Sequence, residues 1–191
     1  MINAVILAAG ESKRMGKTKA LLRFGETTFL GQIISVVRSS DVDKVSVVLG
    51  ADAERIKKSV DLSGMEVVIN EDYRKGQLSS LIAALESIPP ATEAILVCLV
   101  DNPFINRIVI NCIVSKFKET GSPIVMPIFE KKRGHPTLFA ASLFKELVNA
   151  PVEEGARYVV NCNAEKVEEV EVDDGKVLVG INTPEDYETY F

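Results

Sequence analysis

The sequence predicts an α/β fold of three layers, α/β/α, in which helices cover both faces of a mostly parallel, mixed sheet. Two observations lead to this prediction: short apolar runs rich in valine and isoleucine recur along the chain, and amphipathic segments with helical spacing separate them. Because the runs are continuously apolar, they suit strands that are buried on both faces. The alternation of such strands with helices implies βαβ crossovers, which make neighbouring strands parallel.

Apolar runs mark the expected strands in the first two thirds of the chain, at residues 4–8, 45–49, 67–69, 94–100 and 124–126. Between them, apolar residues that share one helical stripe predict helices. The stripes are Phe29, Ile33, Val36 and Val37, then Leu78, Leu81, Ile82 and Leu85, and finally Ile110, Ile113, Val114 and Phe117. This order of strands and helices is Rossmann-like.

The pattern changes after about residue 130. A short strand and two short helices are expected there, at residues 135–139, 142–149 and 154–161. Further on, apolar segments at 167–172 and 176–179 flank Asp173-Asp174-Gly175. An Asp-Gly pair between such segments predicts a C-terminal β-hairpin.

The composition is that of an ordinary globular protein: of the 191 residues, 47% are apolar and 26% are charged. No linker or repeat interrupts the chain, so we expect a single domain spanning residues 1–191, with a last helix that Pro184 opens. The net charge of −5 argues against a nucleic-acid partner, because general binding to nucleic acid needs positive charge to displace counterions.

The cysteines Cys98, Cys112 and Cys162 are an odd number without CxxC spacing, which favours a reducing compartment over a disulfide or zinc framework. The first residues lack the basic segment of a secretory signal. No apolar stretch approaches the ~18 residues needed to cross a bilayer. We therefore expect a cytoplasmic protein with no membrane partner.

A basic loop that contains glycine follows the first expected strand, from Leu7 to Lys19. Gly10 and Gly16 allow left-handed or crowded backbone close to a ligand. Cationic residues gather at 13–23 although the chain is acidic overall. Free backbone N–H groups with Arg and Lys side chains make an anion site, and this end of a strand is where open α/β sheets bind ligands. The alternative is a flexible basic loop without a ligand.

Two further segments place polar groups at the same edge of the sheet. Gln77, Ser79 and Ser80 open a helix after the third strand, where they are either plain caps or ligand donors. Asp101 follows the apolar run 94–100. Its carboxylate either caps the next helix or binds a divalent ion such as Mg²⁺.

Two segments later in the chain are also candidates. Basic residues precede Gly134-His135-Pro136 and would attract an anionic ligand. His135 is the only histidine, and it is either structural or part of a binding site. Asn182 and Thr183 stand before Pro184, where either can cap the last helix.

The loop after the first strand resembles the LAAGxSxRMGxxK signature of nucleotidyltransferases with the glycosyltransferase-A-like fold. Within that fold it is similar to the molybdenum cofactor cytidylyltransferases, the MocA/MobA-like group. The resemblance implies that the loop wraps a nucleoside triphosphate through Leu7, Ala8, Ala9, Gly10, Arg14 and Lys19. Guanylyltransferase relatives tend to read LAGG at this point, so Ala9 favours cytosine.

The other candidates resemble the same family in the same order along the chain. Gln77, Ser79 and Ser80 match a stretch that contacts ribose and base, and Gly134-His135-Pro136 matches the start of a strand beside the acceptor. Asp101 matches the aspartate that holds magnesium. Asn102 stands where the cytidylyltransferases typically have Gln and the guanylyltransferases Met, and Asn182 stands where most members have a second aspartate.

The resemblance implies nucleotidyl transfer from an NTP, first of all CTP, to the terminal phosphate of an acceptor, by analogy molybdopterin, with release of pyrophosphate. It implies Arg14, Lys19 and Asp101 as catalytic residues, and Mg²⁺ or Mn²⁺ held by Asp101 and Asn182. A molybdoenzyme would receive the product. The alternatives are a guanylyltransferase, a sugar-phosphate nucleotidyltransferase, and a non-catalytic protein that binds nucleotide or delivers cofactor.

Overall fold

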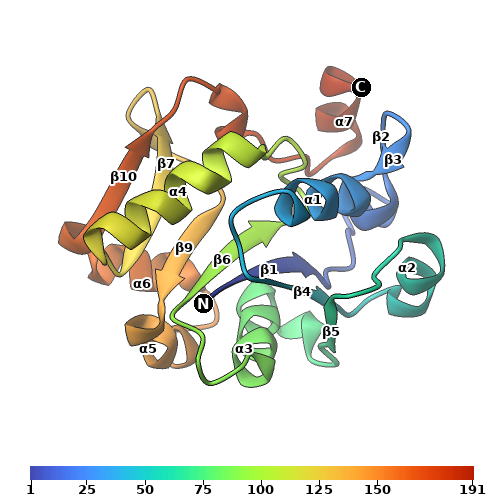
Figure 1. Cartoon of the computed structure of the whole chain (residues 1–191). Coiled ribbons are helices and arrows are strands. Elements are labelled where there is room, and N and C mark those ends of the chain that lie inside the picture. Colours follow the sequence, from blue (N-terminus) through green and yellow to red (C-terminus); the bar gives the residue numbers. More distant parts are fainter.

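A computed structural model describes residues 1–191. It contains an eight-stranded sheet with the order β10-β7-β9-β6-β1-β4-β5, in which β8 pairs with β7 (Figure 1). The strands of this sheet are β1 (Ile2–Ala8), β4 (Lys44–Leu49), β5 (Glu66–Ile69), β6 (Ala94–Leu99), β7 (Ile124–Phe129), β8 (Lys132–Arg133), β9 (Thr137–Ala140) and β10 (Val167–Glu171). A separate pair consists of β2 (Arg23–Phe24) and β3 (Thr27–Thr28). The strands predicted from apolar runs are thus confirmed, with β9 beginning two residues later than expected.

The α-helices are α1 (Phe29–Arg38), α2 (Ala53–Ser59), α3 (Gln77–Ser87), α4 (Arg107–Thr120), α5 (Phe144–Val148), α6 (Ala156–Cys162) and α7 (Pro184–Tyr190). Short 3-10 helices are η1 (Lys19–Leu21), η2 (Tyr73–Lys75), η3 (Ala141–Leu143), η4 (Ala164–Lys166) and η5 (Gly175–Leu178). Every predicted helix is present, and α2 is the one the apolar stripes did not predict. None of these helices is long and apolar enough to span a membrane.

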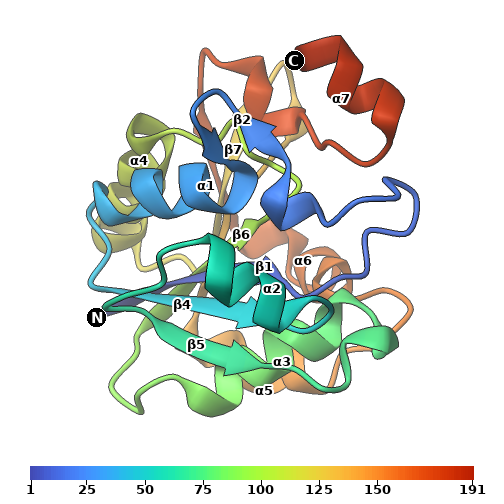
Figure 2. The same ribbon diagram turned by 90° about the vertical axis from the view of Figure 1, so that its right-hand side faces the viewer.

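Helices cover both faces of the sheet, which confirms the three-layer prediction (Figures 1 and 2). Side chains of β1 alternate between two cores. Ile2, Ala4 and Ile6 pack in a core with α1, α2 and α4. Val5 and Leu7 pack in the opposite core with α3, α5 and α6. The sheet is mixed as predicted, because β9 runs antiparallel to β6 and β7 whereas β4, β1 and β6 are parallel.

The predicted C-terminal β-hairpin was wrong. After β10 the chain forms the 3-10 helix η5 instead of a second strand, and β10 pairs in parallel with β7. The Asp174 carboxylate accepts a hydrogen bond from the backbone N–H of Lys176, which starts this turn. Gly175 is not among the residues with positive φ that such hairpins favour. Its missing side chain serves packing, because a Cβ there would lie 2.9 Å from the Phe129 ring.

The two-residue hairpin of the sheet lies elsewhere, between β7 and β8. It is closed by Glu130 and Lys131, whose φ angles are 46° and 64°. Positive φ at both central residues is the geometry that suits a tight hairpin. Neither residue is the Asn, Asp or Gly that is typical of such a turn, so the residue types did not predict it.

Candidate active site

The candidate site lies where β1 and β6 end. These neighbouring strands are parallel, so their carboxyl ends meet at one edge of the sheet. The basic loop leaves β1 after Ala8, and the turn that carries Asp101 leaves β6 after Leu99. This edge is the place where open α/β sheets bind their ligands.

The basic loop is fixed by its own turn and by one buried side chain. Ser12 has a φ of 54°, and its carbonyl accepts hydrogen bonds from the N–H groups of Met15 and Gly16 at 3.0 Å. The Ser12 hydroxyl accepts a further bond from the Lys19 N–H at 3.0 Å. Met15 is buried in a small core that also contains Ile181. This core therefore brings together the chain segments that carry Arg14 and Asn182.

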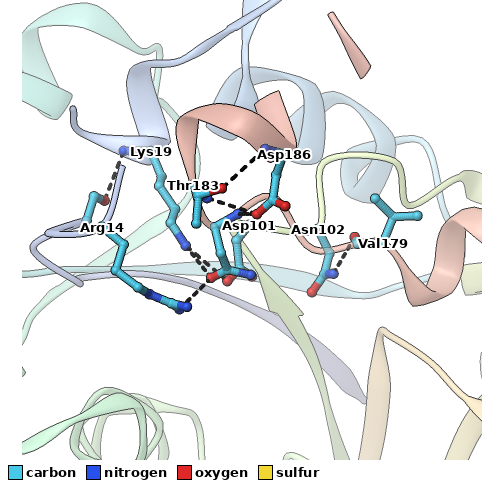
Figure 3. Close-up of polar contacts among 9 residues, drawn as sticks. Arg14, Lys19, Asp101, Asn102, Val179, Thr183 and Asp186 are labelled. Atoms are coloured by element: carbon cyan, nitrogen blue, oxygen red, sulfur yellow. Dashed lines mark hydrogen bonds and ion pairs between the residues drawn. The ribbon is translucent and has the colours of Figure 1, made fainter. Parts of the chain in front are cut away.

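The structure brings the predicted cations and the predicted metal donors into direct contact (Figure 3). Arg14 Nη2 lies 3.0 Å from Asn182 Oδ1. Lys19 Nζ lies 2.8 Å from the same oxygen and 3.3 Å from Asp101 Oδ2. The Lys19 side chain is largely buried, with 13% of its surface exposed. Four residues from three distant parts of the sequence thus form one cluster.

Backbone hydrogen bonds hold Asn182 in this cluster. The N–H of Ile181 donates to the Asp101 carbonyl at 2.7 Å. The Asp186 carboxylate accepts from the N–H groups of Asn182 and Thr183 at 2.8 Å and 2.9 Å. These two donors hold the pKa of Asp186 below its usual value. Thr183 caps α7 in return, so both capping and the cluster depend on the same turn.

Asn102 supports the same segment instead of facing a base. Its side-chain N–H donates to the Val179 carbonyl at 2.7 Å, and only 5% of the residue is exposed (Figure 3). It does not line the pocket described next. Asn102 therefore holds Val179, and Asp101 holds Ile181, in the segment that leads to Asn182. This structural role of Asn102 could not be predicted from its position in the sequence.

A pocket of about 200 Å³ opens beside the cluster. Seven of the predicted nucleotide and catalytic residues line it, namely Leu7, Ala9, Gly10, Lys19, Gln77, Ser80 and Asp101. Ser12, Tyr73, Gly76, Leu99 and Val100 complete the lining. Backbone, hydroxyl, amide and ammonium groups thus line the pocket together with apolar side chains, as is usual for small-molecule binding sites.

Three predicted nucleotide residues do not line this pocket, and one of them is Arg14, whose guanidinium contacts Asn182 beside it. Ala8 is buried in the core on the α1 and α4 side, because β1 alternates its side chains. The Ser79 hydroxyl donates to the carbonyls of Asp72 and Gly76 and accepts from Asn70, so it holds the turn before α3. Asn70 also donates to Ser80 at 3.0 Å, which fixes the hydroxyl that does reach the pocket.

The predicted acceptor residues lie outside the pocket, on the chain that enters β9. The N–H of His135 donates to the Val177 carbonyl at 2.9 Å. A Cβ on Gly134 would lie 2.6 Å from that carbonyl oxygen, so only glycine allows this approach. Pro136 is buried beside them. The Nδ1 atom of His135 is buried without a hydrogen-bond partner.

Burial and two charged side chains act on the pKa of His135. Burial lowers the pKa of His135, the negative charge of Asp101 opposes this shift, and the positive charge of Arg157 adds to it. Arg157 belongs to α6, far along the chain, and is exposed. No motif pointed to Arg157, because its approach to His135 depends on the fold alone.

The donors at the cluster fit a divalent ion. The Asp101 carboxylate and the Asn182 carbonyl converge closely enough for one ammonium group to contact both. Oxygen donors are those that Mg²⁺ and Mn²⁺ prefer, and Mg²⁺ commonly takes one or two carboxylates with phosphate and water. The chain has no group of three or more His, Cys, Asp or Glu that could hold a metal without a substrate.

Sequence reasoning missed two residues of the pocket. Ser12 lies inside the signature loop and could have been included, because a hydroxyl among glycines and cations suits phosphate. Tyr73 lies in η2, and nothing in its surroundings in the sequence marks it. It reaches the pocket because Gly50 leaves space: a Cβ on Gly50 would lie 2.8 Å from the Tyr73 side chain.

The fold has three layers, and its sheet carries a basic loop after one strand and a carboxylate suited to metal binding after the parallel neighbouring strand. This is the arrangement of a nucleotidyltransferase. The chain belongs to the MobA-like NTP transferase family, whose model matches residues 4–170.

Curated relatives cover the chain to different extents. Nicotine blue oxidoreductase of Paenarthrobacter nicotinovorans is 28% identical over 153 residues, which are 74% of this chain and 72% of that protein. Molybdenum cofactor cytidylyltransferase of Escherichia coli strain K12 is 24% identical over 189 residues, 98% and 94% of the two chains. Bifunctional protein GlmU of Rhizobium etli is 32% identical over 171 residues, but these are 84% of this chain and only 37% of GlmU.

Solved structures show the same fold. Rv0371c of Mycobacterium tuberculosis H37Rv has a TM-score of 0.89 and 31% identity, and the match covers 98% of this chain and 95% of that one. The complex of Rv0371c with manganese has a TM-score of 0.81 and 28% identity, covering 98% and 96%. A related protein of this fold is therefore known with a divalent ion.

Proposed function

We propose that this enzyme transfers the nucleoside monophosphate of CTP to the terminal phosphate of a small acceptor, with molybdopterin as the leading candidate, and releases pyrophosphate. The observation that carries the proposal is the contact of Lys19 with both Asp101 and Asn182 beside the 200 Å³ pocket. Cations, a carboxylate and an open pocket occur together there. The transfer of a nucleotidyl group from a triphosphate to a phosphate acceptor requires these features, because both reactants are anions.

The loop supplies the charges for the donor. A triphosphate along Gly10 would meet the Lys19 ammonium from one side and the exposed Arg14 guanidinium from the other. The contacts with Asn182 place both side chains beside the pocket, so they can supply positive charge where negative charge develops on the α-phosphate and pyrophosphate. Catalysis then depends on position and electrostatics, without a covalent enzyme intermediate.

The base end of the pocket favours a pyrimidine. Ala9 is 3% exposed and is one of the residues that line the pocket. The Ala9 carbonyl is already bonded to the N–H of Ala51, which fixes the backbone there. Gln77 and Ser80 offer an amide and a hydroxyl that can recognise the amino and carbonyl groups of cytosine.

The acceptor would approach from Gly134-His135-Pro136. A phosphate monoester has a second pKa of about 6, so it is already an anionic nucleophile near neutral pH and needs no strong base. Burial holds His135 neutral, which suits it to shape or hydrogen-bond the acceptor, while Arg157 supplies positive charge nearby. Asp101 and Asn182 would hold a divalent ion there, and its charge would offset the negative charge of the phosphates.

The test is a panel of reactions. Each of the four NTPs is incubated with molybdopterin, with a sugar phosphate such as glucosamine or N-acetylglucosamine 1-phosphate, or with no acceptor, in the presence and absence of Mg²⁺. Pyrophosphate release is measured. The proposal expects release that requires Mg²⁺ and is fastest with CTP and molybdopterin. Binding of CTP without any Mg²⁺-dependent release would instead indicate a nucleotide-binding or cofactor-delivery protein.

Two arms of the panel follow from particular relatives. The likeness to GlmU is the reason for the sugar phosphates, and fastest release with one of them would replace molybdopterin as the acceptor. The likeness to nicotine blue oxidoreductase makes hydride transfer a second candidate. Oxidation of NADH or NADPH by the chain with an electron-accepting dye, and no pyrophosphate release with any NTP, would favour it.

A further inference from the structure

The side-chain oxygen of Asn182 is fully used by two cations. It accepts hydrogen bonds from Lys19 Nζ at 2.8 Å and from Arg14 Nη2 at 3.0 Å. A carbonyl oxygen has two lone pairs, so neither is free for another partner. The same Lys19 ammonium also lies 3.3 Å from Asp101 Oδ2.

These two oxygens are the donors that the proposed function assigns to a divalent ion. Mg²⁺ binds oxygen at about 2.0–2.1 Å, so an ion held by both would lie between them, where the ammonium group of Lys19 is. Two positive charges at such short range repel strongly in a partly buried site. Such an ion can therefore bind only after Lys19 has moved away.

We propose that Lys19 and the divalent ion exchange places at Asp101 and Asn182, and that this exchange couples metal binding to nucleotide binding. The inference rests on the proposed function, because it takes these two residues as the metal donors. Lys19 would then have a second role besides its contact with phosphate. It would hold the Asp101 and Asn182 oxygens in position until the ion replaces it.

The chain allows Lys19 to move without a change of fold. Its N–H is bonded to the Ser12 hydroxyl at 3.0 Å, and the next residue, Ala20, is 1% exposed in the core. The backbone is thus fixed, and only the flexible side chain has to turn. Lys19 already lines the pocket with Gly10 and Ser12, where the phosphates of a nucleotide would receive the ammonium group.

This destination produces the coupling. Without a nucleotide, a metal ion must displace the Lys19 ammonium group from two good hydrogen-bond acceptors. The ammonium group then has no new partner, so metal binding is weak. With a triphosphate in the pocket, Lys19 has an anionic partner, so the cost of displacement falls. By linkage, metal and nucleotide then raise each other's affinity by the same factor.

The test measures Mn²⁺ affinity of the full chain by electron paramagnetic resonance of free Mn²⁺, first without nucleotide. Lys19→Met keeps the length of the side chain and removes the ammonium group. We expect it to bind Mn²⁺ about tenfold more tightly than the wild-type protein. Saturating CTP should raise the Mn²⁺ affinity of the wild-type protein about tenfold more than that of Lys19→Met.

Matched variants separate exchange from a general loss of charge. Lys17→Met removes the same charge from the same loop, and Lys17 is exposed and makes no ion pair, so Mn²⁺ affinity should stay within about twofold of wild type. Lys19→Arg keeps a cation and should also bind Mn²⁺ weakly without nucleotide. If thermal melting shows that Lys19→Met does not fold, Lys19→Gln replaces it.

Asp101→Asn separates the failure of this inference from the failure of the proposed function. It should lose most Mn²⁺ binding. Undiminished binding by Asp101→Asn would mean that the metal site itself is misplaced. Loss of binding by Asp101→Asn together with equal Mn²⁺ affinities of Lys19→Met, Lys17→Met and wild type would refute the exchange and leave the metal site standing.

Discussion

At His135, burial has a measurable consequence for stability. It lowers the pKa of the imidazole from its ordinary value of 6.5, despite the opposing charge of Asp101. The unfolded chain therefore binds this proton more readily than the folded protein. His135 contributes stability above about pH 6.5, and that contribution is lost as pH falls toward the lowered pKa.

We expect the unfolding free energy of wild type to fall between pH 7 and pH 5 by an amount that His135→Asn removes. The slope from one group is at most about 1.4 kcal/mol per pH unit. Urea unfolding of both proteins at several pH values measures the difference. Parallel curves for the two proteins would show that His135 takes up its proton equally well in the folded state.

Ala9 offers a second prediction at the residue scale. Ala9 lines the pocket, and Ala9→Gly removes its methyl group, so a larger base should be tolerated better. We expect the ratio of kcat/KM for CTP over GTP to fall by about tenfold, as one methyl group in a pocket typically allows. An unchanged ratio would show that Ala9 does not select the base.

Among the elements, the segment from Val179 to Asn182 is held in part by Asn102. Asn102→Leu keeps the volume but removes the donor to the Val179 carbonyl, at an expected cost of about 1 kcal/mol for a part-buried carbonyl without a partner. Since Asn182 would shift, KM for Mg²⁺ should rise more than KM for CTP. Both constants come from the pyrophosphate assay.

The double variant with Asn182→Ala shows whether Asn102 acts through Asn182. Non-additive effects are expected of residues that work through one another. Asn102→Leu should then add little to the rise in KM for Mg²⁺ that Asn182→Ala already causes. Fully additive effects would separate the two residues.

Elements with strong local patterns were predictable, whereas long-range approaches were not. The strand that precedes the basic loop follows from its apolar run, since any fold would bury it. The C-terminal hairpin failed because Gly175 serves a close approach to Phe129, a contact that only the folded chain creates. Its Asp-Gly signal is the same in either case. The turn at Glu130 and Lys131 shows the converse, a hairpin without the residues that signal it.

The site divides in the same way. Arg14, Lys19 and Asp101 could be proposed because each lies in a segment with a chemical character of its own. Ser79 and Ser80 differ in a way that spacing on a helix does not reveal, because the Ser79 hydroxyl is bonded within the turn before the helix whereas Ser80 lines the pocket. Arg157 and Tyr73 could not be found, since their approach is a property of the tertiary fold.

Across the whole molecule, an aromatic cluster ties the C-terminal helix to the body that carries the loop. Phe104 lies with its ring centre 5.6 Å from Phe24, 5.2 Å from Tyr190 and 5.6 Å from Phe191. These rings come from β2, the chain before α4 and the end of α7. Because α7 begins just after Asn182, the aromatic cluster also supports the segment that carries Asn182.

We expect Phe104→Leu to weaken this attachment by about 1–2 kcal/mol, since aromatic pairs contribute ~0.5–1.5 kcal/mol each. Hydrogen exchange should rise in α7 while β1 and β6 stay protected. Phe117→Leu is the matched control, because Phe117 packs on the opposite end of α4 against the main core. Equal exchange in α7 for the two variants would contradict this account of the cluster.

We expect Lys19 and Arg14 to hold a polyanionic donor opposite the Asp101 carboxylate. The rate of Mg²⁺-dependent pyrophosphate release from CTP and acceptor is measured for wild type and Lys19→Ala, with melting temperatures in parallel. Loss of the ammonium group should lower the rate about 10²- to 10³-fold while the fold stays intact. Equal rates for the two folded proteins would show that Lys19 does not act on the donor.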